Sequence, residues 1–177
     1  MIINSQKRTF GRGEKVSLFT LGTMRATESL EKMYSIIKNA YYVGINHIET
    51  APSYGDAESL IGNSIKKLEI EENIKEKNWV ITSKVLPKGD FDFLKNNFQN
   101  SLKKLNLKKI NNLAIHGLNL KQHLDWVLAG EGKKFISWAL DKRLVDQVGF
   151  SSHEVIHLLK KQLTVKFLIF VVFIYII

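Results

Sequence analysis

Four side chains that can hold or transfer a proton lie at or just beyond the ends of short apolar stretches. They are Glu49, Tyr54, Lys84 and His116. If these stretches are parallel strands, their carboxyl ends meet at one rim of a sheet, where catalytic groups sit in parallel α/β folds. The sequence therefore predicts that a carboxylate, a phenol, an ammonium and an imidazole share one rim.

A lysine at the end of a buried strand points to a particular chemistry. The ammonium of Lys84 is costly to desolvate unless a carboxylate pairs with it, and Glu49 is the expected partner. A phenol beside a buried ammonium has its anionic form stabilised, so we expect the pKa of Tyr54 to fall below about 10. Tyr54 is then a candidate proton donor to a carbonyl oxygen, which His116 could orient.

Each of these residues also has a structural interpretation, which the sequence leaves open. Glu49 and Lys84 can form an ion pair that only closes the top of the fold. Tyr54 can be a packing residue with a hydrated hydroxyl, and His116 a hydrogen-bonded core histidine. His47 is expected to be such a core histidine. The histidines and acidic residues lack the compact spacing of metal ligands, so no metal site is predicted.

The elements that would position these side chains alternate along the chain. Apolar runs predict strands at residues 16–21, 45–50, 79–85, 112–117 and 145–150. Apolar residues at helical spacing predict helices at 27–41, 56–68, 94–105 and 135–140, a helical or irregular segment at 119–129, and a last helix from 155 to 159. Thr27, Asp56 and Asp90 are expected N-caps. This alternation predicts a parallel sheet with right-handed helical crossovers.

Both ends of the chain depart from this alternation. Residues 1–15 are polar and are expected to form an irregular lead-in or a short hairpin. Residues 167–177 form an unbroken apolar run, which is shorter than the roughly 20 residues of a membrane-spanning helix. Its β-branched and aromatic residues favour a sixth buried strand. Left uncovered, such a strand would be an aggregation hazard.

The composition limits the class of protein. The chain has 177 residues, enough for one ordinary domain but short of the roughly 250 of a barrel with eight strand–helix units. It has no cysteine, which excludes disulfides, iron–sulfur clusters and thiolate catalysis. The N-terminus lacks a basic and then apolar signal peptide, and we expect a cytoplasmic protein.

The formal net charge of +9 has two interpretations. One is nucleic-acid binding. The other, which we favour, is a solvated lysine-rich surface, because the lysine pairs are spread through the predicted helices and no recognised nucleic-acid motif accompanies them. No specific nucleic-acid partner and no stable membrane span are expected.

Five short motifs, from about residue 16 to residue 153, together resemble the aldo-keto reductase family. They are Leu21-Gly22-Thr23, the stretch from His47 to Gly55, Thr82-Ser83-Lys84, Ile115-His116-Gly117 and Val148-Gly149-Phe150-Ser151-Ser152. Each motif is weak alone, but their order and separation are fairly specific.

The resemblance implies a (β/α)8 barrel that moves hydride between NADPH and a small carbonyl or alcohol substrate. The family's proton-donating tyrosine, its lysine and its histidine match Tyr54, Lys84 and His116, and its aspartate falls at Glu49. The extra methylene of this glutamate would shift the ion pair by roughly a bond length, and about 1 Å of misplacement can cost on the order of 100-fold in rate. The family's nicotinamide contacts would fall at Gly22, Thr23, Ser151 and Ser152, the last replacing a usual asparagine.

The resemblance also implies a partial barrel, because the family's aromatic stacking residue and its cofactor-phosphate loops belong to its last strands. The chain is expected to be a single incomplete domain of five to six strand–helix units, with a lead-in at 1–15, a family-like part at 16–153 and an atypical apolar tail at 167–177. So few strands cannot close with the shear and tilt of eight, and a truncated or frame-shifted reading frame would explain this. Two alternatives to a reductase stay open: an inactive fragment or binding module, and, less favoured, a membrane- or nucleic-acid-associated protein.

Overall fold

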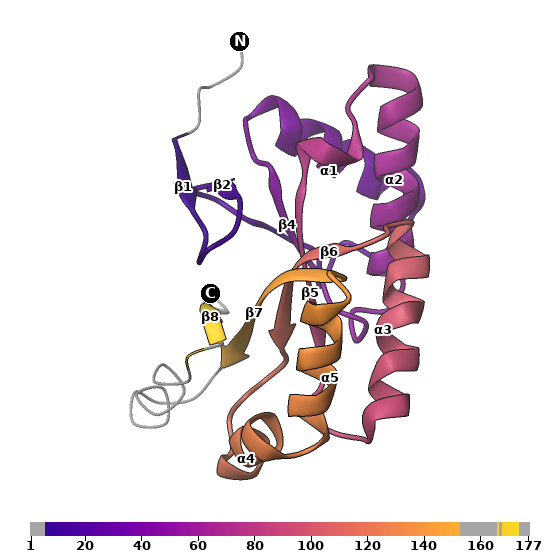
Figure 1. Cartoon of the computed structure of the whole chain (residues 1–177). Coiled ribbons are helices and arrows are strands. Elements are labelled where there is room, and N and C mark those ends of the chain that lie inside the picture. Colours follow the sequence, from indigo (N-terminus) through magenta and orange to yellow (C-terminus); the bar gives the residue numbers. More distant parts are fainter. Residues whose placement is uncertain (1–5, 153–165, 167, 174–177) are drawn as a thin grey trace.

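Six parallel strands form the sheet on which the protein is built (Figure 1). The computed structural model describes residues 6–152, 166 and 168–173. The strands are β3 (Leu21–Gly22), β4 (His47–Glu49), β5 (Val80–Val85), β6 (Ile110–Ile115), β7 (Val145–Ser152) and β8 (Leu168–Phe173). They lie in this order across the sheet, and each pairs in parallel with the next. The predicted α/β fold with a parallel sheet is confirmed.

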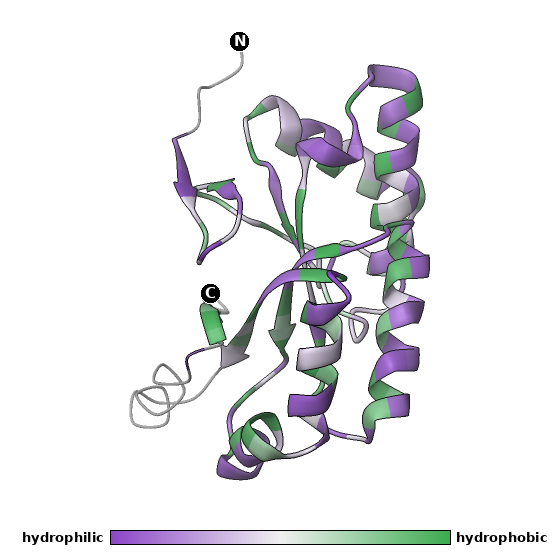
Figure 2. Ribbon diagram, in the orientation of Figure 1, coloured by the Kyte–Doolittle hydropathy of each residue, from purple (hydrophilic) through white to green (hydrophobic). Residues whose placement is uncertain are grey.

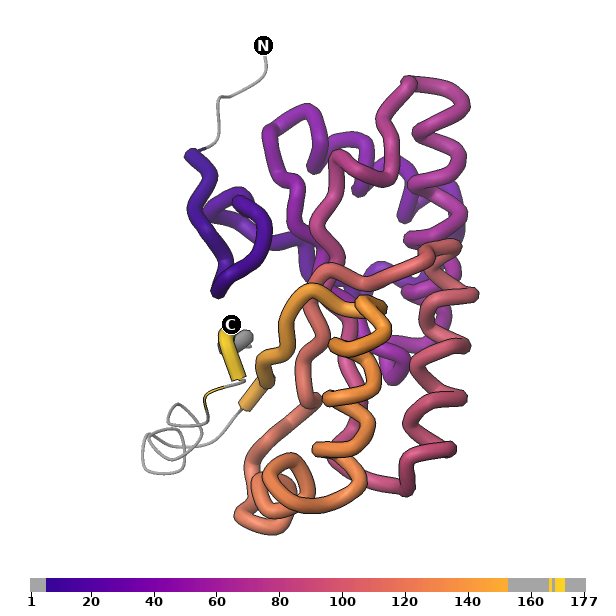
Figure 3. The backbone as a smooth tube through the Cα atoms, in the orientation of Figure 1, coloured from indigo at the N-terminus to yellow at the C-terminus, as the bar shows by residue number. Residues whose placement is uncertain are grey.

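Helices follow each of the strands β3 to β6, and they lie on the outer face of the sheet except for the first of the two helices after β6, which packs on the second (Figure 3). They are α1 (Leu30–Tyr42), α2 (Ala57–Glu72), the 3₁₀ turn η1 (Glu76–Asn78), α3 (Phe91–Leu105), α4 (Lys121–Ala129) and α5 (Glu131–Asp141). Asp90 begins α3 as expected, because its carboxylate accepts a 2.8 Å hydrogen bond from the backbone N–H of Phe93. Asn73 and Asn106 end α2 and α3 in the left-handed region, with φ of 56°.

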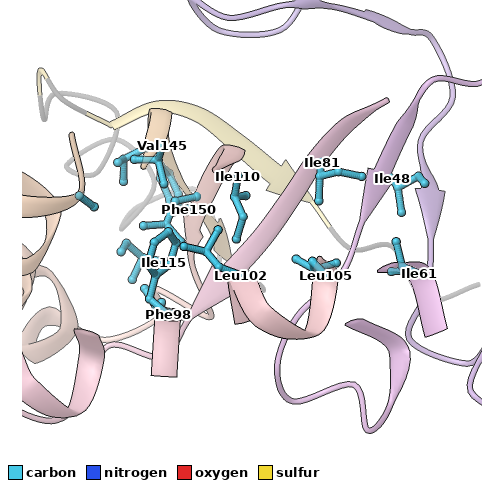
Figure 4. Packing of buried hydrophobic residues seen from close by; sticks show 14 of the residues in the cluster. Ile48, Ile61, Ile81, Phe98, Leu102, Leu105, Ile110, Ile115, Val145 and Phe150 are labelled. Atoms are coloured by element: carbon cyan, nitrogen blue, oxygen red, sulfur yellow. The ribbon is translucent and has the colours of Figure 1, made fainter. Parts of the chain in front are cut away.

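The main hydrophobic core lies between the sheet and the helices (Figure 4). Ile48, Ile81 and Phe150 point from the strands towards Ile61 of α2 and Phe98 of α3, and all five are buried. Figure 2 shows apolar (green) and polar (purple) residues alternating along the helices, as expected for helices with one buried face. Burying one such side chain contributes about 1.5–3 kcal/mol. This layer therefore fixes the helices on the sheet.

The inner face of the sheet, which points away from the helices, carries a chain of polar side chains near the amino ends of the strands. Thr20 Oγ1 lies 2.9 Å from His47 Nδ1, and His47 Nε2 lies 2.7 Å from Thr82 Oγ1. The Asn112 side-chain amide donates to Thr82 Oγ1 at 3.0 Å, and the Gln147 amide donates to Asn112 Oδ1 at 2.7 Å. Side chains from four neighbouring strands and the residue before β3 are thus joined across the sheet.

These contacts give both ring nitrogens of His47 a hydroxyl partner, Thr20 Oγ1 at Nδ1 and Thr82 Oγ1 at Nε2. A hydroxyl can donate or accept, so either neutral tautomer of the imidazole is satisfied here. Burial lowers the pKa of His47 to about 4, so the imidazole is neutral near pH 7. The prediction that His47 is a hydrogen-bonded core histidine is confirmed.

An antiparallel hairpin covers this end of the inner face. Its strands are β1 (Lys7–Thr9) and β2 (Lys15–Ser17). The Gln147 amide donates to Phe10 O at 2.8 Å and accepts from the Arg12 N–H at 2.8 Å. The Phe10 ring lies 4.9 Å from both the His47 and the Phe170 rings, measured between centroids. Of the two forms expected for the lead-in, the hairpin is the correct one.

Two local predictions are wrong. The sequence predicts a single strand at residues 16–21, but the chain forms β2, an exposed bend and β3. The stretch is divided because β2 pairs with β1, and because the Ser17 hydroxyl donates to Phe19 O at 2.6 Å in the bend. Thr27 does not begin α1. Ser29 does, and its hydroxyl accepts a hydrogen bond from the Lys32 N–H at 3.2 Å. Asp56 stands at the N-cap position of α2 without a side-chain capping bond.

The predictions for the C-terminal part have mixed outcomes. The apolar run contains a strand, β8, which lies parallel to β7. The register of β7 and β8 is irregular between Val148 and Phe150, and a Cβ at Gly149 would stand 2.5 Å from the Phe170 ring. The helix expected from residue 155 lies outside the described residues. Within the part that is described, no helix combines the length and apolar character needed to cross a bilayer.

Candidate active site

Lys84 is the centre of the predicted group. Its side chain projects from β5 on the inner face, and the residue is 1% exposed. The ammonium donates to the Thr50 carbonyl oxygen at 3.0 Å and to the Tyr54 hydroxyl at 2.8 Å, and it forms an ion pair with the Glu49 carboxylate. An ammonium has three protons to donate, and these contacts give each a partner. Lys84 is therefore held in one orientation.

Glu49 is the last residue of β4, and the parallel register sets it opposite Thr82, on the same face of β5 as Lys84. Glu49 is 7% exposed. Its carboxylate contacts the ammonium directly, so the ion pair forms with the longer acidic side chain in place. The Thr23 hydroxyl donates to the Glu49 carbonyl oxygen at 3.0 Å and fixes the end of this strand.

Tyr54 lies in the turn between β4 and α2. Its backbone N–H donates to Ala51 O at 3.0 Å and its carbonyl accepts from the Ala57 N–H at 3.1 Å, so the turn is tied at both ends. Gly55 follows with φ of 57°, a conformation that glycine adopts without strain. The phenol ring is 7% exposed, and the Lys84 ammonium lies 4.4 Å from its centroid. The tyrosine thus presents both its hydroxyl and its ring to Lys84.

The pKa of this phenol differs from the sequence-based prediction. A lowered pKa was expected, but burial raises the pKa of Tyr54, and that prediction is wrong. The cause is burial, because removing the phenol from water disfavours its anionic form. Burial also lowers the pKa of Lys84 to about 7. The phenol consequently keeps its proton at neutral pH.

His116 follows β6 directly and completes the group. Its backbone N–H donates to Val85 O at 2.8 Å, which joins this rim position to β5. The imidazole and the Tyr54 ring are perpendicular, with centroids 5.9 Å apart, and Nδ1 lies 3.4 Å from Ser53 Oγ. A cavity of about 210 Å³ is lined by Lys84 and His116 of this group, whereas Tyr54 and Glu49 are not among its lining residues. Its lining includes Lys84, His116, Ser53, Leu86, Phe93 and Leu94.

The four residues expected to contact a nicotinamide stand at the carboxyl ends of two strands. Gly22 ends β3 and Thr23 follows it, whereas Ser151 and Ser152 end β7. Ser151 Oγ accepts a 3.0 Å hydrogen bond from the Gly117 N–H, and the Ser152 hydroxyl donates to Asn119 Oδ1 at 3.1 Å. In the strand order, β4 and β5, which position Tyr54 and Lys84, lie between β3 and β7.

Sequence reasoning missed two buried groups near the site. Glu58 of α2 is 1% exposed and accepts a 2.7 Å hydrogen bond from the Ser83 hydroxyl, beside Lys84. A signal was available, because Glu58 precedes Ile61, Ile65 and Leu68 at helical spacing on the buried face of α2. The Thr50 carbonyl could not be found from residue types, since any residue supplies one. No group of three or more His, Cys, Asp or Glu side chains in the described residues is arranged to hold a metal ion.

Comparison with known proteins agrees with this arrangement. A sequence model of the aldo/keto reductase family matches residues 19–172. An aldose reductase of Encephalitozoon cuniculi (strain GB-M1) is 38% identical over 85 residues, which are 48% of this chain and 27% of that protein.

Solved structures share the fold. An aldo-keto reductase from Bacillus halodurans has a TM-score of 0.80 at 19% identity, over 97% of this chain and 58% of that one. A thermostable aldo-keto reductase in complex with the inhibitor epalrestat has a TM-score of 0.77 at 25% identity, over 96% of this chain and 62% of that one. An aldo-keto reductase from Bombyx mori in complex with NADP has a TM-score of 0.66 at 22% identity, over 83% and 50%.

The present chain spans 27% of the curated relative, and between 50% and 62% of these three solved structures. The family model nevertheless covers all the strands of the parallel sheet up to residue 172, including every residue of the Lys84 group. The chain belongs to the aldo/keto reductase family.

Proposed function

We propose that this protein transfers hydride between NADPH and a small carbonyl or alcohol compound, with Tyr54 as the proton donor. The observation that carries the proposal is the position of the Lys84 ammonium, which contacts the Tyr54 hydroxyl at 2.8 Å and the Glu49 carboxylate together. This arrangement is buried at the rim of a parallel sheet, where functional groups from separate strands meet.

The hydrogen bonding of Tyr54 suits it to donate its proton to a substrate carbonyl oxygen. Its oxygen accepts from Lys84, so the phenol's own proton is directed elsewhere and can reach a carbonyl oxygen. As that proton leaves, the developing phenolate keeps the charge-assisted hydrogen bond from the ammonium, which strengthens as negative charge grows. The raised pKa of Tyr54 keeps the phenol protonated until a substrate oxygen begins to accept the proton.

Glu49 and His116 have supporting roles in this scheme. The Glu49 carboxylate favours the charged form of Lys84, which burial alone would disfavour. The His116 imidazole, which is perpendicular to the Tyr54 ring and lines the cavity, would orient the same substrate oxygen. The apolar lining from Leu86 and Phe93 suits the non-reacting part of a small carbonyl compound.

The rim residues fit the nicotinamide end of a dinucleotide. Ser151 Oγ accepts a backbone hydrogen bond and keeps its own proton to donate to a carboxamide oxygen. At Gly22 no described atom lies within 4 Å of the place a Cβ would occupy, so the backbone there is open to close approach. The Thr23 side chain is held in place by its hydrogen bond to the Glu49 carbonyl oxygen, and the Ser152 side chain by its hydrogen bond to Asn119. NADPH, when bound, supplies the hydride.

The test is NADPH oxidation measured by absorbance with a panel of aldehydes. Tyr54→Phe should lower kcat/KM by about 100- to 10,000-fold, the range for loss of a general acid. Tyr34→Phe is the matched control, because it removes a surface phenol that donates to Glu71 at 2.7 Å. Unchanged turnover in Tyr54→Phe would end the assignment.

A second candidate function is cofactor binding without turnover. Titrating NADPH into the protein and following the cofactor's fluorescence separates the two. Binding without turnover supports a binding module, and neither binding nor turnover supports an inactive fragment.

A further inference from the structure

Glu58 is a buried carboxylate that the proton-transfer scheme does not use. It lies on the outer side of the sheet, on α2, and is 1% exposed. We propose that Glu58 is a positioning residue, which holds the Tyr54 hydroxyl and the Lys84 ammonium together by tying the helix after Tyr54 to the strand of Lys84. The effect of Glu58 on catalysis rests on the proposed function, whereas its effect on the contact between Tyr54 and Lys84 can be tested alone.

The first link of this tie is the bond to β5. The Ser83 hydroxyl donates to Glu58 Oε1 at 2.7 Å, and both groups are buried. Ser83 directly precedes Lys84, and successive strand residues point to opposite faces. Holding Ser83 from the helix side therefore fixes the backbone from which Lys84 extends on the inner side.

The second link is the short distance along the chain from Tyr54 to Glu58. The Ala57 N–H donates to the Tyr54 carbonyl at 3.1 Å, so the turn with Tyr54 runs directly into the first turn of α2. Glu58 is in that first turn. A displacement of α2 relative to β5 would consequently move the Tyr54 hydroxyl away from the Lys84 ammonium, with which it forms a 2.8 Å bond.

Helix α3 packs closely on α2 near Glu58, although Oε2 of this carboxylate has no hydrogen-bond partner among the described residues. Burial raises the pKa of Glu58, and the Ser83 hydroxyl, the Ser101 hydroxyl and the charge of Lys104 oppose this by favouring the carboxylate. One helical turn beyond Glu58, Gly62 packs on α3 so closely that a Cβ would stand 2.5 Å from Lys104 O. Glu58 thus lies where α2, α3 and β5 meet.

Stability alone does not account for a carboxylate at this place. Burying a charged group costs several kcal/mol before its hydrogen bonds are counted, and apolar residues of similar volume often replace buried charges without loss. An apolar side chain would pack between the helices and the sheet but could not accept the Ser83 proton. What the carboxylate adds is a directional bond that sets the position of one backbone relative to another.

The test uses the full chain with tyrosine labelled by ¹³C at Cζ, and the Tyr54 signal is assigned from its absence in Tyr54→Phe. Glu58→Ala and Ser83→Ala should shift this signal in the same direction as Lys84→Met does. Glu58→Gln keeps an acceptor for Ser83 and should leave the signal near its wild-type position. Ser64→Ala is the control, because it removes a buried hydroxyl from the same helix that has no hydrogen-bond partner among the described residues.

Kinetics provide the second readout. If about 1 Å of misplacement costs on the order of 100-fold, Glu58→Ala and Ser83→Ala should lower kcat by roughly 10- to 100-fold with little change in KM, and Glu58→Gln should restore most of it. Should Glu58→Ala fail to fold, Ser83→Ala still tests the tie, since it removes a single hydroxyl.

The outcomes separate the two proposals. A shifted Tyr54 signal in a protein whose wild type shows no NADPH turnover supports the positioning role and removes the reductase. Wild-type turnover, with kcat and the Tyr54 signal unchanged in Ser83→Ala and in any folded Glu58→Ala protein, overturns the positioning role alone.

Discussion

Removing the Lys84 ammonium should destabilise the protein strongly, because it leaves a buried charge behind. In Lys84→Met, the Glu49 carboxylate stays 7% exposed, and its Oε1 has no hydrogen-bond partner elsewhere in the described residues. Breaking a buried ion pair by deleting one partner costs about 3–5 kcal/mol. The Thr50 carbonyl and the Tyr54 hydroxyl also lose their bonds to the ammonium. We expect the free energy of unfolding to fall by about 3–5 kcal/mol.

Removing both charges should be milder than removing one. In Glu49→Gln combined with Lys84→Met, no unpaired charge remains and the volumes are nearly kept, and such replacements are often neutral or stabilising. The double variant should therefore recover about 2 kcal/mol or more of the loss in Lys84→Met. The difference in the free energy of unfolding between the double variant and Lys84→Met measures the cost of the unpaired carboxylate and not the strength of the ion pair.

Urea denaturation at neutral pH, followed by circular dichroism, supplies the free energies if the slopes agree among variants. Lys38→Met is the matched control, because Lys38 pairs with Glu72 on the surface and its loss should have little effect. The reasoning is refuted if Lys84→Met costs less than about 1 kcal/mol, or if the double variant is no more stable than Lys84→Met.

Three further predictions concern the scaffold. Burial lowers the pKa of His47 from 6.5 to about 4, so the free energy of unfolding rises with pH between these values. Acidification to about pH 5 should therefore cost about 2 kcal/mol. The urea midpoint of His47→Gln should lack the part of the pH dependence that comes from His47. Gly62→Ala should lower the free energy of unfolding by about 1–3 kcal/mol despite the better helix propensity of alanine, because its Cβ meets the α3 backbone. Thermal unfolding measures this, with the exposed Lys66→Ala as the control. Equal midpoints for the two variants would contradict the close packing. Asp90→Ala should lose about 1 kcal/mol with the α3 cap, and Asp90→Asn should retain most of that in chemical denaturation.

The order of elements and the side of the sheet that carries the chemistry could be predicted from the sequence. Apolar runs of strand length alternate with helical spacing, and a parallel sheet brings the ends of its strands to one rim whatever the details. The sequence accordingly predicts that Glu49, Tyr54, Lys84 and His116 lie together and that the apolar tail contains a strand, and the structure has both features. Local signals also sufficed for the Asp90 cap.

Other features depend on partners that are distant in the sequence. The stretch at residues 16–21 divides into two short strands because its halves pair with different neighbours, β1 and β4. The rise in the Tyr54 pKa is caused by burial of the phenol. A residue pattern does not contain the extent of that burial.

The sequence by itself determined which residue types follow which strands, because apolar periodicity and chain order are local properties of the polypeptide. The tertiary structure decided which of those residues touch: Lys84 with Thr50 O, Glu58 with Ser83, and His47 within its chain of side-chain hydrogen bonds. Such contacts depend on register, on side-chain length and on how much water is excluded, and these are fixed only when the helices close onto the sheet.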